Sequence, residues 1–140
     1  MKVIIGIAMI VLALVVGIVP LFTDCQSQGR ALTLENGKTV PMKCHWTGRA
    51  ELVAAFPLVG MGLVTALSRK KETGRAMGVM GLILGVFIIL VPANLIGVCS
   101  TPSMLCLSVM RPTLLAAGAL VIVLSGIVLV RSLGKDTSDI

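Results

Sequence analysis

The chain has 140 residues, enough for one compact domain, and 56% of them are hydrophobic whereas only 13% are charged. Soluble domains are about 45–50% apolar and about 25% charged, so this sequence has more apolar surface than a water-soluble core of its size can bury, and it predicts a protein whose solvent is lipid. The net charge of +6 does not indicate nucleic-acid binding, because the cations are spread over ends and loops. The aromatic residues are too few to stack bases, since the chain has three Phe, one Trp and no Tyr.

Four apolar segments have about the length of 20 residues that an α-helix needs to cross a bilayer. Backbone polar groups in lipid must be satisfied within the segment, so we expect each segment to form a helix. The predicted spans are residues 3–22, 50–68, 76–95 and 113–130. They predict an all-α membrane protein, a four-transmembrane-helix bundle that forms a single membrane domain over residues 1–140.

The first segment has one feature of a secretory signal, because Lys2 precedes its apolar run. A signal core is about 7–15 residues long and ends at a cleavage site of small residues. Residues 3–22 form a longer run, and neither such a site nor the small residues of a lipidation site precede Cys25. We therefore expect this segment to be kept as a span.

The distribution of Lys and Arg predicts the orientation of the chain. The connection between the second and third spans is the most densely basic segment, and we expect it to lie in the cytoplasm with both termini, in a bacterial inner or plasma membrane. The longer loops, residues 23–49 and 96–112, are then extracytoplasmic. The cations of the predicted cytoplasmic side are Lys2, Arg69, Lys70, Lys71, Arg75, Arg131 and Lys135, and those of the other side are Arg30, Lys38, Lys43, Arg49 and Arg111.

Glycines recur inside the spans at spacings that let membrane helices approach closely. Gly81 and Gly85 form a small-xxx-small pair in the third span, Gly78 lies near the same stripe, and Gly60 and Gly62 lie in the second span. We predict that these five residues pack against neighbouring helices, although Gly is in any case enriched in membrane helices.

No charged residue lies at the centre of a predicted span, which argues against a stand-alone pump, ion channel or proton-coupled transporter. The polar residues at the span ends are expected at the membrane interface. Trp46 beside His45 suits that position. Glu51 is expected near the start of the second helix, where a carboxylate interacts well with the helix dipole, and Arg111 precedes a Pro that opens the fourth helix.

The first outer loop predicts a β-hairpin. Asn36-Gly37 lies between short alternating runs and supplies the positive φ angles of a two-residue turn. A symmetric fold about this pair sets Leu34 opposite Thr39 and Gly29 opposite Cys44. Cys25 is four residues before Gly29, so the hairpin brings it near Cys44. The predicted fold class therefore includes a small extracytoplasmic cap that contains a β-hairpin.

All four cysteines, Cys25, Cys44, Cys99 and Cys106, fall in the predicted outer loops. An even number on the oxidising side is typical of structural disulfides. The favoured pairing joins Cys25 to Cys44 and Cys99 to Cys106, whereas a cross-loop pairing would staple the two loops together. Each bridge would add about 2–4 kcal/mol of stability.

Two other roles stay open for this loop region. A cysteine pair in each of two outer loops of a four-helix protein resembles the layout of quinone-coupled disulfide oxidases, but neither pair has the Cys-x-x-Cys spacing that commonly supports an attacking thiol. Soft ligands suit Cu(I), although oxidised cysteines would leave only His45 and two Met residues to bind it. We predict no metal and no cofactor; the soft ligands concerned are Met42, Cys44, His45, Met104 and Cys106.

Several short blocks stand out along the chain. They are Lys43-Cys44-His45-Trp46-Thr47 with Ala50-Glu51, then Leu95-Ile96-Gly97-Val98-Cys99, then Met104 with Cys106, and Arg111-Pro112. Together they resemble an uncharacterised family of small four-span bacterial membrane proteins with a Cys-His-Trp-Thr block. Members of that family are similar to companions of ABC-type export permeases of the macrolide and lipoprotein-release class, so the resemblance implies an accessory role.

These observations favour a non-catalytic accessory or structural subunit of a bacterial membrane complex, with no catalytic residue of its own. The expected partners are the lipid bilayer and either a membrane protein, which the resemblance implies is an ABC permease, or a second copy of the chain. The chain lacks a Gly-rich nucleotide-binding motif with its Lys, so a partner would supply ATP hydrolysis. Two alternatives are a membrane thiol–disulfide oxidoreductase and a self-assembling membrane structural protein.

Overall fold

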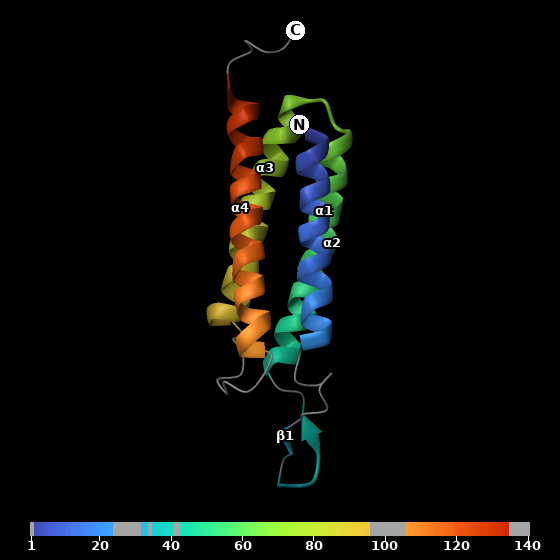
Figure 1. The fold of residues 1–140 in the computed structure, drawn as a ribbon, viewed down its shortest axis with the longest axis vertical. Helices are drawn as coiled ribbons and strands as arrows, with labels where there is room; N and C mark the ends of the chain where they lie inside the picture. Colours follow the sequence, from blue (N-terminus) through green and yellow to red (C-terminus); the bar gives the residue numbers. More distant parts are fainter. Residues whose placement is uncertain (1, 24–31, 34, 41–42, 96–105, 135–140) are drawn as a thin grey trace.

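Four long α-helices run up and down along one axis and form a bundle (Figure 1). The structure, a computed structural model, describes residues 2–23, 32–33, 35–40, 43–95 and 106–134. Two short π-helical segments, η1 and η2, continue the third helix and precede the fourth. In chain order the elements are α1 (Lys2–Thr23), β1 (Leu32–Thr33), β2 (Thr39–Val40), α2 (Lys43–Leu67), α3 (Lys71–Leu90), η1 (Val91–Leu95), η2 (Cys106–Met110) and α4 (Arg111–Leu133).

The two ends of the bundle differ in what they carry. At the terminal end, α1 begins, α4 ends and residues 68–70 join α2 to α3 (Figure 1). At the opposite end, called the hairpin end below, β1 and β2 project from the helices. The basic connection, the start of α1 and the end of α4 therefore lie at the same end of the bundle. Its cytoplasmic location stays a prediction.

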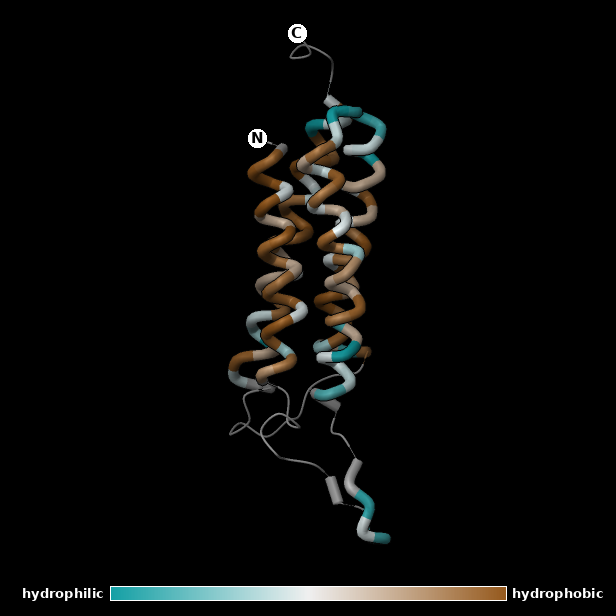
Figure 2. The backbone as a smooth tube through the Cα atoms, turned by 90° about the vertical axis from the view of Figure 1, so that its right-hand side faces the viewer, coloured by the Kyte–Doolittle hydropathy of each residue, from teal (hydrophilic) through white to brown (hydrophobic). Residues whose placement is uncertain are grey.

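Each of the four helices is long and apolar enough to cross a membrane. Figure 2 shows hydrophobic residues along the length of the bundle and hydrophilic ones gathered towards its ends. The protein is therefore a multi-pass membrane protein, and the predicted all-α bundle of four spans is confirmed at this level. The helical segments that meet the requirement are Val3–Phe22, His45–Leu67, Lys71–Leu95 and Ser108–Leu133.

The second helix begins well before the predicted residue 50. Arg49 and Glu51 interrupt the apolar run in the sequence, but a helical backbone continues through them to Lys43. On this helix Arg49 is exposed whereas Glu51 is buried. Because α2 begins at Lys43, Glu51 lies about two turns inside the helix rather than near its start.

Glycines on α3 allow close packing against α4. Gly78, Gly81 and Gly85 are all buried, and a Cβ atom built on Gly85 would lie 2.5 Å from Cγ1 of Ile122. A larger residue therefore has no room at Gly85, which lies directly against α4.

The two glycines predicted to pack on α2 behave differently from each other. A Cβ atom on Gly62 would lie 2.7 Å from Cγ1 of Ile10 and 2.9 Å from the carbonyl oxygen of Gly6, so Gly62 brings α1 and α2 together. Gly60 is exposed, and a Cβ atom there would meet no atom within 4 Å. Gly60 and Gly62 therefore differ within this bundle, because residues two apart are separated by about 200° around a helix and cannot share a face. Packing of Gly60 against another helix stays a prediction.

The core lies along the axis where the four helices meet. All four contribute side chains with 1% exposure or less. Lipid tails are as apolar as these side chains, so burial away from lipid gives little net gain. Close dispersion contacts therefore hold the helices together. Fully buried examples are Val16, Leu58, Ile88, Leu114 and Val121.

The predicted hairpin is present only as a short pairing, in a different register. Thr33 pairs with Thr39 and Leu32 with Val40, so the predicted pairing of Leu34 with Thr39 is off by one residue. A two-residue turn of the predicted type needs positive φ at both central residues, but Gly37, at 81°, is the one described residue with a positive φ. A longer loop results, and two residue pairs do not support the predicted structured cap.

Candidate functional site around a buried glutamate

Glu51 is the most unusual side chain of the bundle. It is 0% exposed, and neither of its carboxyl oxygens has a hydrogen-bond partner among the described residues. The prediction that it lies near the start of the second helix is wrong, because α2 begins at Lys43, about two turns earlier, and Glu51 is turned towards the interior.

The direction in which Glu51 points follows from its neighbours on α2. Gly48 lies against Pro20 of α1, where a Cβ atom would be 3.2 Å from the proline Cβ, and Met61 lies against Gly81 of α3. On a helical projection with 100° per residue, Glu51 falls between these two sides. It therefore points towards the bundle axis, at the hairpin end.

The residues buried at the hairpin end offer no charged partner. They are apolar in the other described elements, with Pro20 in α1, Val91 and Pro92 in η1 and Met110 in η2. Thr47, one turn before Glu51, is also completely buried. Among the residues that the structure describes, Glu51 is the only ionisable one in the buried set.

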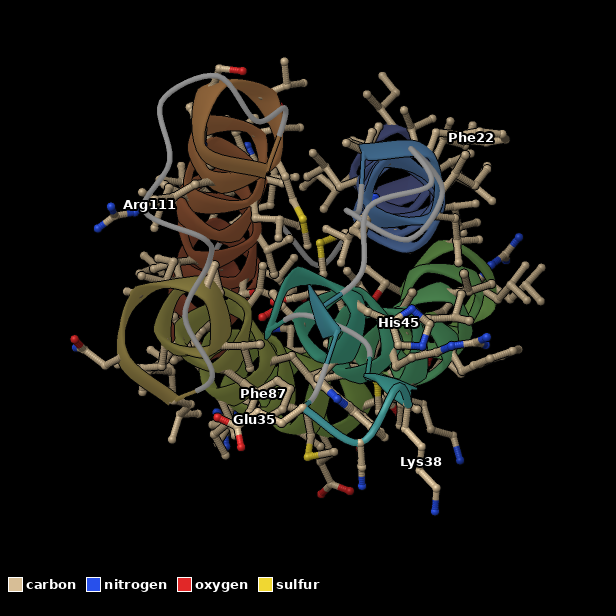
Figure 3. The ribbon with its side chains drawn as sticks, turned by 90° about the horizontal axis from the view of Figure 1, so that it is seen from below. Phe22, Glu35, Lys38, His45, Phe87 and Arg111 are labelled. Carbon is tan, nitrogen blue, oxygen red and sulfur yellow. The ribbon has the colours of Figure 1, made fainter. Side chains whose placement is uncertain are left out.

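The charged and aromatic residues predicted at the interface lie on the outside. Trp46 is 56% exposed, and the ring of His45 meets it edge-on with centroids 5.8 Å apart. Figure 3, which looks along the bundle from the hairpin end, shows Arg111 pointing away from the helices. These three residues have the exposure that an interfacial position requires, which Glu51 does not.

A buried carboxyl without partners is expensive to keep ionised. Placing a charged side chain at the centre of a membrane helix costs about 2.5–3.5 kcal/mol on insertion scales. Such residues face the interior and mark sites of function in membrane proteins. We therefore take Glu51, with Thr47 beside it, as the candidate functional site.

A second buried polar group lies elsewhere in the bundle. Ser125 of α4 contacts Gly81, and its hydroxyl has no hydrogen-bond partner in the described part of the chain. Met61 reaches the same glycine, and it is ten residues beyond Glu51 on α2, or about 15 Å along the axis. Ser125 and Glu51 therefore do not form one site.

The predicted disulfides and their redox and metal alternatives stay predictions. Cys25 and Cys99 lie outside the described residues, and only the backbone of Cys44 and Cys106 is described, in α2 and η2. Met42 and Met104 also lie outside them. Within the described ranges, no three His, Cys, Asp or Glu residues come together as a metal site would need.

Comparison with known families identifies the family of the chain. Residues 2–131 match the family described as a domain of unknown function, DUF4418. The chain belongs to the DUF4418 family. Neither the curated proteins nor the solved structures include a match to it.

The sequence of this DUF4418 protein does contain a signal for the buried glutamate. Thr47, Glu51, Ala54, Leu58 and Met61 follow one another at spacings of three and four, which is the stripe of one helix face. All five are buried. A second span that begins at residue 50 lacks the turn that contains Thr47, so hydropathy alone does not place Glu51 on this face.

Proposed function

We propose that this DUF4418 protein is a non-catalytic subunit of a larger membrane complex, and that the outer face of α2 binds a transmembrane helix of the partner. The observation that carries the proposal is Gly60, a glycine on the outside of a membrane helix with open space around it. In membrane proteins, glycines let helix backbones approach closely, and no helix of this bundle uses Gly60 in that way.

The surroundings of Gly60 support a docking surface. The outer face of α2 presents large apolar side chains on both sides of Gly60, with Phe56 74% and Leu63 50% exposed. Pro57 is exposed on the same face. A residue without a side chain between two bulky ones leaves a notch into which a ridge of a partner helix fits. The other exposed large apolar residues of α2 are Trp46, Val53, Val64 and Leu67.

The proposed partner is an integral membrane protein with transmembrane helices of its own, and the resemblance described above implies an ABC-type export permease. In that arrangement the bundle would sit beside the permease in a bacterial inner or plasma membrane. The hairpin end would face the extracytoplasmic side and the basic terminal end the cytoplasm. A second copy of the chain is the competing occupant of the same face.

Purification of the tagged protein in a mild detergent or in nanodiscs, with mass spectrometry of its companions, tests the proposal. We expect a permease in a fixed ratio to the wild-type protein. Gly60→Leu should lower its recovery about tenfold, equivalent to about 1.4 kcal/mol of binding free energy.

The matched control is Gly126→Leu on α4, because a Cβ atom at Gly126 also meets nothing within 4 Å. This variant should keep the partner. A wild-type protein that purifies alone as a monomer, or a Gly60→Leu variant that retains its companion fully, contradicts the proposal. A homo-oligomer that Gly60→Leu dissolves would instead assign the face to a second copy of the chain.

A further inference from the structure

The burial of Glu51 needs an explanation that an accessory role does not supply. A complex can be assembled through exposed faces, whereas this carboxyl group is 0% exposed and its oxygens have no partner among the described residues. Replacing it by an apolar residue of similar volume would avoid the desolvation cost altogether. Its presence inside the bundle therefore indicates a task for the carboxyl group itself.

No cation in the described residues is placed to neutralise Glu51. The only charged residue of α1, Lys2, and those of α3, Lys71, Glu72 and Arg75, lie at the terminal end, whereas Glu51 lies towards the hairpin end. η1 has no charged residue, and Arg111, next to η2, is exposed. On α2 itself, His45 is partly exposed and Arg49 exposed; only the backbone is described for Lys43, Cys44 and Cys106.

We propose that Glu51 is a proton-binding site within the bundle, which holds its carboxyl group as a neutral acid while the helices are packed. A neutral acid needs no counter-ion and is far cheaper to bury than a carboxylate. The proton would leave to water only when the hairpin end opens, and the carboxylate would then disfavour reclosure. This inference does not rest on the proposed partner, because it concerns the isolated bundle.

The elements at the hairpin end suit such an opening. η1 and η2 are π-helical, and π-helical turns are rare interruptions of the regular α-helical ladder that occur frequently at functional sites. Both segments bury residues at this end, with Val91 1% and Met110 0% exposed. Displacement of these two segments is the opening that we propose, and it leaves the glycine-packed helix pairs together.

Infrared spectroscopy of the protein in lipid, with its glutamates carbon-13 labelled, tests the proposal directly. The carbonyl stretch of a neutral carboxylic acid is separate from the bands of a carboxylate. We expect one labelled acid band at neutral pH that Glu51→Gln removes and Glu72→Gln, at an exposed position, leaves in place. Absence of the band from the wild-type protein, or its persistence in the Glu51→Gln variant, would overturn the proposal.

Thermal unfolding at a series of pH values provides a second readout. Because the folded state holds the proton and the unfolded state releases it, stability falls as the pH rises. The melting temperature of the wild-type protein should fall by about 3 °C for each pH unit above about pH 5, as long as the folded state keeps its proton. The Glu51→Gln variant should lose this slope. Parallel curves for the two proteins would show that Glu51 binds no proton on folding.

Discussion

The two faces of α2 differ from those of a water-soluble helix, because its inner face buries polar as well as apolar residues and its outer face exposes large apolar ones. Its inner face buries the polar residues Thr47, Glu51 and Thr65, and its outer face exposes Phe56 and Leu67. In water the apolar stripe would face the core. In lipid, burial of an apolar side chain gains little, so steric fit and the placing of polar groups decide which face turns inward.

Filling the close contact of Gly62 on the inner face of α2 should have the largest effect on stability. Gly62→Leu should destabilise the bundle by about 3 kcal/mol or more, because overpacking forces backbone shifts. A Cβ atom there would lie 2.9 Å from the carbonyl oxygen of Gly6, which cannot move without the whole of α1. Thermal unfolding in detergent measures the loss.

Removal of the side-chain part of that clash provides the control. Ile10→Ala in the Gly62→Leu background should restore only part of the stability, because the contact with the Gly6 backbone remains. Full restoration would show that the new leucine clashes only with the Ile10 side chain and not with the backbone of α1. An unaffected Gly62→Leu protein would contradict the observed packing of the two helices.

A charge on the outer face has the next largest effect. Phe56 is 74% exposed and lies midway along the membrane segment of α2, so Phe56→Glu places a carboxylate against lipid, at a cost of about 2.5–3.5 kcal/mol. The yield of membrane-inserted protein should fall, whereas Phe56→Leu should leave it unchanged. Normal insertion of Phe56→Glu would show that this face does not meet the hydrocarbon.

These opposite faces explain which parts of the fold could be predicted. The spans depend on length and apolar content, and the packing of Gly81 and Gly85 depends on a spacing that keeps them on one stripe; all of these can be read from the sequence. The position of Glu51 depends on where α2 begins, and hydropathy alone does not define the start of a helix that contains charged residues.

The strand register shows a second limit of the same kind. Asn36-Gly37 predicts a turn, but the register depends on whether Asn36 adopts a positive φ, and here it does not. Its side-chain oxygen instead accepts a hydrogen bond from the backbone N–H of Lys38 at 3.4 Å. A turn of this kind mimics part of a backbone turn, and it shifts the pairing by one residue.

Removal of the buried carboxyl group should stabilise the bundle. Glu51→Leu replaces a buried carboxyl that has no partner among the described residues by an apolar group of similar size, and we expect a gain of about 1–3 kcal/mol. Thermal unfolding at neutral pH is the measurement. Ser125→Ala, which removes a buried hydroxyl also found without a partner among the described residues, provides a comparison at a group that does not titrate. A loss of stability in Glu51→Leu would show that the carboxyl makes favourable contacts in the bundle.

The smallest effect on the isolated bundle is expected at Gly60. Gly60→Leu adds a side chain where a Cβ atom meets nothing within 4 Å, so its stability should stay within about 0.5 kcal/mol of the wild type. The same substitution two residues later, at Gly62, is expected to be the most damaging of all. Thermal unfolding of the two variants in one detergent measures this difference, and equal losses would show that α2 packs on both faces. If Gly60→Leu is silent for stability and still weakens partner recovery, its effect belongs to the outer face and not to the fold.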